Sequence, residues 1–279
     1  MSIMIPKITT LGGGIEIIHV IPLETEIDRA VRPFEVEGGF KANKAYILTA
    51  AVPLGTETIE EAQHYLNETR RRLEAQGITV EVVETNTVSI LDIISKVSRI
   101  VKKEQEKGNI VYVNMSAGGP FVSVGTALAS MVQGARLYYV RAAGLSLTER
   151  ERSVHGNAIV TEPQIHFLEN FNIQLPDKRG QLLLVELYKR EEMRTSEVLN
   201  FLHEKGIEGF EDDPEKLRRN EKIGMLMRLN KGISGKLEDA GYILKEKRGR
   251  QNIYKITDSG KYVACASGLV ENARSISYN

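Results

Sequence analysis

Short apolar runs rich in β-branched residues alternate with longer segments of helical period through the first half of this chain of 279 residues. This alternation is expected when helices connect parallel strands and cover both faces of the sheet. It predicts an α/β fold with a Rossmann-like, doubly wound and mostly parallel sheet. We expect strands at residues 15–21, 45–50, 79–83, 110–114 and 137–140, and helices at 25–34, 58–76, 88–107 and 120–133.

A weaker apolar pattern at residues 151–165 leaves room for one further edge strand. The strand–helix alternation then stops at residues 175–180, where proline, glycine and charged residues interrupt the apolar pattern. We therefore expect a Rossmann-like domain at 1–174, a linker at 175–180 and a second domain at 181–279.

The second domain has a different order of elements. A helical period begins at Leu182, and Thr195 stands before an apolar helical face as a candidate N-cap. A third helical segment covers 214–237, where Gly224 and Gly232 could divide it. Two strands are expected beyond it, at residues 242–244 and 253–256. Three helices followed by a hairpin predict an α+β winged helix-turn-helix domain.

Charge and cysteine content narrow the class of protein. The whole chain is neutral, but residues 177–279 carry three more basic than acidic residues, which weakly favours contact with nucleic acid. Cys265 is the only cysteine, and the histidines lack metal-ligand spacing, so we expect a reduced cytoplasmic protein with no metal and no cofactor. Apolar runs long enough for a membrane span are absent from the sequence, as is a secretory signal.

The end of the chain carries three successive motifs. Gly235-Lys236-Leu237-Glu238-Asp239-Ala240-Gly241 closes a helix, Lys247-Arg248-Gly249-Arg250 forms a basic cluster, and Thr257-Asp258-Ser259-Gly260 begins another helix. Together they resemble the end of a winged helix-turn-helix domain, which implies duplex DNA as a partner. We expect groove and phosphate contacts from the recognition helix and the wing, through Arg228, Asn230, Lys231, Ser234, Lys236, Lys247, Arg248 and Arg250. The alternatives are a merely solvated charged face and a winged helix that contacts protein.

Two strand ends carry candidate ligand-binding residues. In an open α/β sheet, the carboxyl ends of the strands beside the switch point form a ligand crevice, and helix N-termini there attract anions. The candidates are Leu23, Glu24 and Thr25 after the first strand, Asn114, Met115, Ser116, Ala117, Gly118 and Gly119 after the fourth, and Arg141 after the fifth. The glycine pair is also compatible with a simple tight turn, and Arg141 with a surface salt bridge.

These loops resemble a known family. Asn114-Met115-Ser116-Ala117-Gly118-Gly119 is similar to the Asn-x-(Ser/Thr)-x-Gly-(Gly/Thr) motif of CARF domains, the CRISPR-associated Rossmann folds. The opening His-Val-Ile-Pro-Leu-x-x-Glu-x-Asp-Arg at residues 19–29 resembles archaeal regulators in which a CARF domain is fused to a winged helix. The resemblance implies a homodimer that binds a cyclic oligoadenylate, cyclic tetra-adenylate by preference, between two sensor domains. The chain departs from the family at Pro120, where many members carry Thr-Lys.

Three further residues have alternative interpretations. Asp28 and Arg29 could act on a phosphodiester, but an ion pair between them in the first helical turn is the simpler interpretation. His19 lies inside a predicted strand, which favours a core histidine over a catalytic base.

The leading hypothesis is a dimeric regulator in which ligand binding repositions two winged helices on DNA. A ring nuclease that degrades the cyclic oligoadenylate is the alternative, although the sequence contains no evident activated nucleophile. A Rossmann dehydrogenase is disfavoured, because the glycines at 12–14 precede the first strand.

Overall fold

The computed structural model describes residues 14–50, 58–249 and 251–271. The chain divides between Asn172 and Ile173 into two compact units. Each unit buries an apolar core of its own. None of the helices in the described ranges is both long and apolar enough to span a membrane.

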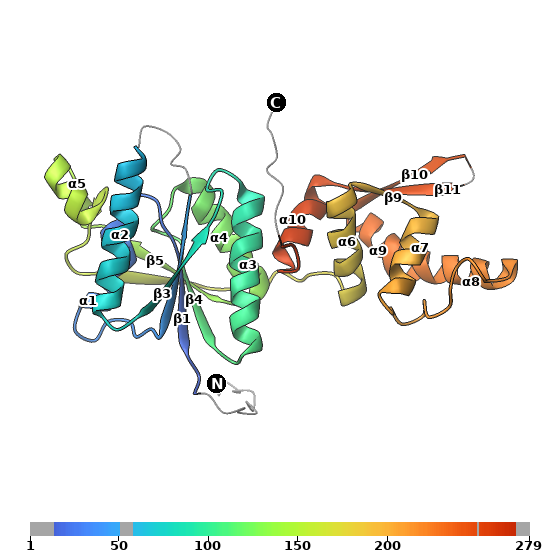
Figure 1. Cartoon of the computed structure of the whole chain (residues 1–279), viewed down its shortest axis with the longest axis horizontal. Helices are drawn as coiled ribbons and strands as arrows, with labels where there is room; N and C mark the ends of the chain where they lie inside the picture. Colours follow the sequence, from blue (N-terminus) through green and yellow to red (C-terminus); the bar gives the residue numbers. More distant parts are fainter. Residues whose placement is uncertain (1–13, 51–57, 250, 272–279) are drawn as a thin grey trace. The chain divides into compact units, whose positions relative to one another are not determined.

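The first unit is built on a six-stranded sheet (Figure 1). Its strands are β1 (Ile17–Pro22), β2 (Lys44–Thr49), β3 (Thr79–Glu84), β4 (Ile110–Asn114), β5 (Arg136–Arg141) and β8 (Gln164–Leu168). The order in space is β3-β2-β1-β4-β5-β8, with β1 to β5 parallel and β8 antiparallel to β5. The direction of strand addition reverses between β1 and β4, which makes their carboxyl ends the switch point. The predicted Rossmann-like sheet is confirmed.

Four helices cover the two faces of this sheet, with α1 and α2 on one side and α3 and α4 on the other (Figure 1). They are α1 (Ile27–Glu35), α2 (Ile59–Ala75), α3 (Ile90–Glu106) and α4 (Pro120–Gln133). Three of these helices begin at residues that favour a helix N-terminus. Thr58 forms a capping box with Glu61 at the start of α2, Ser89 caps α3, and Pro120 occupies the first turn of α4. Buried aliphatic side chains such as Ile21, Ile27 and Leu73 join α1 and α2 to the sheet.

Between β5 and β8 the chain makes a small excursion, here called the 144–159 segment. It contains β6 (Gly144–Leu145), α5 (Glu149–His155) and β7 (Ala158–Ile159), and β6 pairs antiparallel with β7. Helix α5 has no buried residue. The edge strand that the sequence suggested at 151–165 is therefore mostly wrong, since α5 occupies its first residues and the edge strand β8 begins only at Gln164.

The second unit has the expected three helices, a hairpin and a closing helix. Its elements are α6 (Lys178–Arg190), β9 (Glu192–Arg194), α7 (Thr195–Glu204), α8 (Arg219–Leu229), the π-helix η1 (Asn230–Ser234), α9 (Gly235–Asp239), β10 (Ile243–Arg248), β11 (Gln251–Ile256) and α10 (Asp258–Ala266). The strands form one antiparallel sheet in the order β10-β11-β9. Strand β9 was not predicted, because three residues are too few to show an alternating pattern.

Two local predictions in this unit are wrong. Thr195 does not cap α7: Arg194 is the N-cap residue, and the Thr195 hydroxyl donates instead to the Asn252 carbonyl at 3.1 Å. The third helical segment begins at Arg219 and not near residue 214; Gly224 lies inside α8, whereas Gly232 lies in η1, where the α-helical pattern is interrupted. Gly235 follows the π-helix η1 directly. It has to be a glycine, because a Cβ there would lie 2.4 Å from the Asn230 carbonyl oxygen.

Candidate functional site

The two predicted ligand loops meet at the switch point of the sheet. Strands β1 and β4 are neighbours, so the loop after β1 and the loop after β4 leave the sheet side by side. The Glu24 N–H donates to the Ala117 carbonyl at 3.1 Å, which joins the two loops directly. The fold therefore brings residues 23–25 and 114–119 to one place, as the strand order requires.

Asn114 and Ser116 hold the second loop in shape. Asn114 is fully buried, its Nδ2 donates to the Arg29 carbonyl at 3.0 Å, and its Oδ1 accepts from the Ser116 N–H at 2.7 Å and the Ser116 hydroxyl at 2.6 Å. The Ser116 hydroxyl in turn accepts from the Val140 N–H at 3.1 Å. The side chains of Asn114 and Ser116 are thus used within the protein, and they position the loop.

The glycine pair makes room for protein side chains. A Cβ on Gly118 would lie 2.4 Å from a methyl group of Val122, and a Cβ on Gly119 would lie 2.6 Å from Oε2 of Glu24. Glu24 accepts hydrogen bonds from the Gly119 N–H and from the Thr87 side chain. Gly119 is the N-cap residue of α4, so a carboxylate of the chain itself occupies the helix N-terminus where the sequence suggested a ligand anion.

The carboxyl groups of the first loop are partly desolvated. Burial raises the pKa of Glu24, although the hydrogen bonds from Gly119 and Thr87 oppose the shift. Burial also raises the pKa of Glu26, the N-cap residue of α1, against the opposing charge of Arg29. Both groups therefore bind protons more readily than exposed glutamates, and both place negative charge beside the two loops when ionised.

Arg29 is a cationic group beside the two loops, although the sequence predicted for it an ion pair with Asp28. Its Nη1 donates to the Ser116 carbonyl at 3.2 Å, and its guanidinium carbon lies 5.5 Å from the centre of the Tyr139 ring. Its ion pair is with Glu26, at 3.8 Å. Nε of Arg29 and Oε2 of Glu26 are buried and have no hydrogen-bond partner among the described residues. Arg29 therefore has a donor to spare beside both loops.

Asp28 has different partners from those expected. It is 1 % exposed, and its carboxylate pairs with Arg72 at 3.2 Å and accepts from His155 Nδ1 at 2.9 Å and from the Val160 N–H at 3.0 Å. The predicted ion pair between Asp28 and Arg29 is therefore wrong. The actual partners lie far along the chain, and only the tertiary structure brings them to α1.

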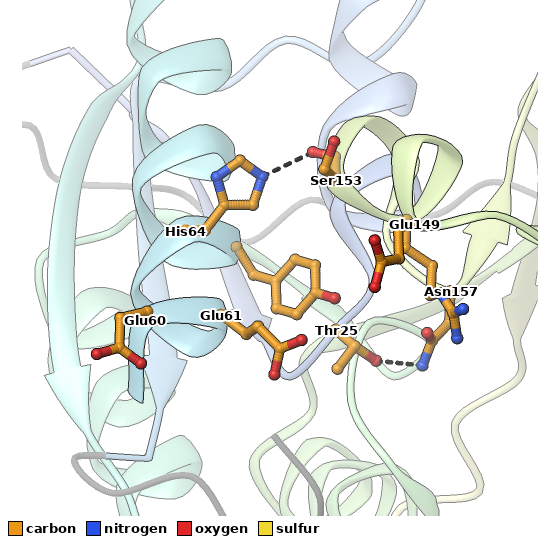
Figure 2. A pocket seen from close by; sticks show the side chains of 9 residues that line it. Thr25, Glu60, Glu61, His64, Glu149, Ser153 and Asn157 are labelled. Atoms are coloured by element: carbon orange, nitrogen blue, oxygen red, sulfur yellow. Dashed lines mark hydrogen bonds between the residues drawn. The ribbon is translucent and has the colours of Figure 1, made fainter. Parts of the chain in front are cut away.

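The 144–159 segment is fastened to the first loop by polar contacts. The Asn157 N–H donates to the Thr25 carbonyl at 2.9 Å, and Asn157 Nδ2 donates to the Thr25 hydroxyl at 2.7 Å. A cavity of about 730 Å³ lies beside this contact, between α2 and α5 (Figure 2). Figure 2 shows His64 reaching across to the Ser153 carbonyl, which it contacts through Nε2 at 2.7 Å. The cavity is lined by Thr25, Glu60, Glu61, His64, Tyr65, Glu149, Arg152, Ser153 and Asn157.

The remaining candidates of the first unit lie at different depths. Leu23 and Ala117 are buried, and Thr25 and Met115 are half-buried. Arg141 is exposed at the end of β5. His19 is a core residue, as predicted, with Nδ1 3.2 Å from the Tyr138 hydroxyl, and burial lowers its pKa to about 3. In the part of the chain that the structure describes, there is no cluster of three or more His, Cys, Asp or Glu side chains that could hold a metal ion.

The candidate recognition helix has a buried and an exposed side. Ser234 is buried, and its hydroxyl donates to the Leu229 carbonyl at 3.3 Å. Asn230 accepts from Lys245 Nζ at 3.0 Å, and Arg228 Nε donates to the Gly209 carbonyl at 2.9 Å. Lys231 is exposed. Lys236 on α9 is exposed as well. Of the five helix candidates, Arg228, Lys231 and Lys236 are therefore exposed cations, while Ser234 faces inward.

The wing carries the other basic candidates. Lys247 and Arg248 are exposed on β10, and Arg250 lies outside the described residues. Arg248 pairs with Glu192 at 3.5 Å and with Glu246 at 3.7 Å. The two neighbouring cations of the wing therefore differ, because Arg248 takes part in ion pairs of the chain and Lys247 has no ion-pair partner among the described residues.

Two family models match separate parts of the chain. Residues 17–144 match the family described as "HFX_2341_N:-like, N-terminal", and residues 180–268 match the family described as "DUF6293 C-terminal winged helix domain". The comparison with curated proteins found no match.

The comparison with solved structures found matches at low sequence identity. The Vibrio cholerae protein VC1899 is 13% identical with a TM-score of 0.38, and the match covers 90% of this chain and 64% of that one. Enterococcus italicus Csm6, bound to cyclic hexa-2'-fluoro-hexa-dAMP, is 11% identical with a TM-score of 0.40, covering 78% and 56%. Can2 from Sulfobacillus thermosulfidooxidans, in complex with cyclic tetra-adenylate, is 10% identical with a TM-score of 0.37, covering 88% and 61%.

The chain thus spans between 56% and 64% of the length of these three proteins. The predicted fold class is confirmed in both of its parts. The N-terminal unit is a Rossmann-like domain that matches the HFX_2341_N-like family, and the C-terminal unit is a winged helix domain that matches the DUF6293 family.

Proposed function

We propose that this chain is a ligand-responsive transcription regulator that acts as a homodimer, with its winged helices on duplex DNA and an anionic cyclic oligonucleotide at its Rossmann-like domains. The observation that carries the proposal is the presence of a winged helix domain, residues 180–268, in one chain with a Rossmann-like domain. A winged helix domain is suited to reading DNA, and ligands of open α/β sheets bind at the switch point.

The ligand class rests on the resemblance of the loops at residues 19–29 and 114–119 to those of CARF domains. Arg29 and Arg141 are the cations that such a ligand would meet first, and both can bind a phosphodiester. Glu24 is a competing anion, because it already accepts the hydrogen bond of the Gly119 N–H. A bound phosphate would have to displace this carboxylate or bind beside it.

Coupling to DNA requires that the ligand distinguish two arrangements of the dimer. The 144–159 segment is attached to the first loop through Thr25 and Asn157, so a ligand that moves the loop also moves this segment. The winged helices of a dimer would then fit, or fail to fit, two half-sites about one DNA turn apart.

A mobility-shift titration tests the proposal. The full chain is titrated on the duplex upstream of its own gene, alone, with cyclic tetra-adenylate, and with linear tetra-adenylate as the control. We expect the cyclic ligand to change the affinity for DNA and the linear one to have a smaller effect. Arg29→Ala should remove the response to ligand and keep the binding to DNA. No change of affinity with any cyclic oligoadenylate would contradict the sensor, and no binding to DNA would contradict the regulator.

The same samples test the ring-nuclease alternative. Labelled cyclic tetra-adenylate is incubated with the protein and then separated from any linear products. Intact ligand after long incubation supports a sensor that does not consume its ligand. Linear products that disappear in the Arg29→Ala variant would favour the nuclease.

A further inference from the structure

The outer face of the wing sheet gathers charged side chains from three strands. The register places Arg248 opposite Gln251, and Arg194 opposite Ile253. Because side chains alternate between the faces of a sheet, residues of one parity share this outer face. The polar ones are Glu192, Arg194, Glu246, Arg248, Gln251 and Lys255, and they share the face with Leu244 and Ile253. The opposite face carries the buried core residues Met193, Ile243 and Tyr254.

A concavity of about 220 Å³ opens on this outer face. It is lined by Glu192, Arg194, Arg248, Gln251 and Ile253. Two guanidinium groups from different strands therefore border one hollow whose floor, Ile253, is buried. Arg194 has no ion-pair partner among the described residues, and the backbone at Arg194 leads directly into α7. A hollow between two arginines is suited to a phosphate, which arginine can bind through two parallel hydrogen bonds.

Carboxylates of the chain compete with a phosphate for Arg248 and for the neighbouring Lys255. Glu192 lies 3.5 Å from Arg248 and 3.9 Å from Lys255, and Glu246 lies 3.7 Å from Arg248 and 2.9 Å from Lys255. All four side chains are between 30% and 55% exposed, so each pair is screened by water and contributes little to stability. A DNA phosphate can therefore replace them at a modest cost in free energy.

We propose that the hollow between Arg194 and Arg248 is a contact site for a backbone phosphate of duplex DNA, and that Glu192 and Glu246 are its intramolecular competitors. The inference rests on the proposed binding to DNA and extends the contact surface from the wing tip to β9. It also assigns the two glutamates the role of weakening DNA binding, so that affinity depends on how readily their ion pairs open.

The test uses full-length variants and a fluorescently labelled duplex of random sequence, with anisotropy measured over a range of salt concentrations. Arg194→Ala should weaken binding and reduce the slope of log affinity against log salt by about one, the value for one lost phosphate contact. The matched control is Arg190→Ala, which removes the same charge from an ion pair with Glu186 on α6. Arg190→Ala should leave the slope unchanged.

The second arm removes the competitors. Glu192→Gln with Glu246→Gln should strengthen binding by about two- to fivefold, the range expected when exposed ion pairs of this kind no longer have to open. Glu186→Gln is the control for charge alone, and circular dichroism checks that each variant is folded. A wild-type chain that binds no duplex at low salt overturns the proposed function and this inference with it. Wild-type binding with equal effects of Arg194→Ala and Arg190→Ala overturns this inference alone.

Discussion

The carboxylate of Glu24 accepts a hydrogen bond from the backbone N–H of Gly119, the N-cap residue of α4. The N-terminus of a helix attracts anions because its N–H groups are unpaired and its dipole is positive there. In this protein the anion is supplied by the neighbouring loop, and the glycine leaves the space that the carboxylate fills. The two loops are thus held together by the group with which the phosphate of the proposed ligand would have to compete.

Glu24→Gln should strengthen the binding of an anionic ligand by about tenfold, since removing one like charge at a partly buried site is worth on the order of 1–4 kcal/mol. The amide oxygen of glutamine can still accept from Gly119 and Thr87, so the loop should keep its shape. The measurement is calorimetric titration with cyclic tetra-adenylate, with Glu60→Gln at the rim of the cavity as the control. Equal affinities of wild type and Glu24→Gln would contradict the competition.

The pH dependence follows from the raised pKa of Glu24. Because burial disfavours the charged form, folding is favoured while Glu24 is protonated, and this contribution is lost as pH rises through its folded pKa, above the ordinary 4.5. Ligand affinity of the wild type should accordingly increase as pH falls from neutral toward that value. In Glu24→Gln the dependence should be shallower, with the remainder due to Glu26, whose pKa is also raised.

Asn114→Ala should lower the free energy of unfolding by about 2–3 kcal/mol, because the Arg29 carbonyl and the Ser116 N–H lose buried hydrogen-bond partners. The measurement is urea denaturation. Asn67→Ala on the exposed side of α2 should change stability by less than about 0.5 kcal/mol. If Asn114→Ala is as stable as the control, the side chain does not shape the loop.

Gly156→Ala should be far more damaging than Gly134→Ala. Gly134 has φ +70° and open space around it, so alanine there costs about 1 kcal/mol. Gly156 combines φ +77° and ψ −156°, a region almost restricted to glycine, with a Cβ position 2.0 Å from the Thr25 carbonyl oxygen. We expect a cost of at least about 3 kcal/mol, or release of the 144–159 segment.

Digestion with trypsin distinguishes a general loss of stability from release of the 144–159 segment. Released segments should be cut at Arg150 and Arg152 in Gly156→Ala under conditions where Gly134→Ala resists cleavage. A Gly156→Ala variant with the stability and protease resistance of Gly134→Ala would show that the segment is not fastened at Thr25.

On the wing, Lys247→Ala should weaken duplex binding more than Arg248→Ala. Arg248 must break its ion pairs with Glu192 and Glu246 before it can contact a phosphate. The new contact therefore replaces existing ones, and its net contribution to DNA affinity is small. We expect a loss of about three- to tenfold for Lys247→Ala and less than about threefold for Arg248→Ala in anisotropy titrations at low salt. A larger loss for Arg248→Ala would mean that its ion pairs open without cost.

The sequence by itself determined the classes of the two domains. The alternation of apolar runs and helical segments specifies a parallel sheet with helices on both faces, because strand and helix periods are local properties of the chain. The same reasoning located the carboxyl ends of β1 and β4 and the wing hairpin. The short strand β9 and helix α5 were missed, since neither is long enough to show a period.

Only the tertiary structure decided which polar groups face the crevice. Asn114 belongs to the predicted motif, but its side chain is hydrogen-bonded to Ser116 and to the Arg29 carbonyl. Nε of Arg29, by contrast, is buried without a hydrogen-bond partner among the described residues. Asp28 takes Arg72 as its partner, 44 positions away, in preference to the adjacent Arg29. The physical reason is that a buried charge takes whichever partner the packing of distant elements brings within reach, and such long-range pairing leaves no periodic trace in the sequence.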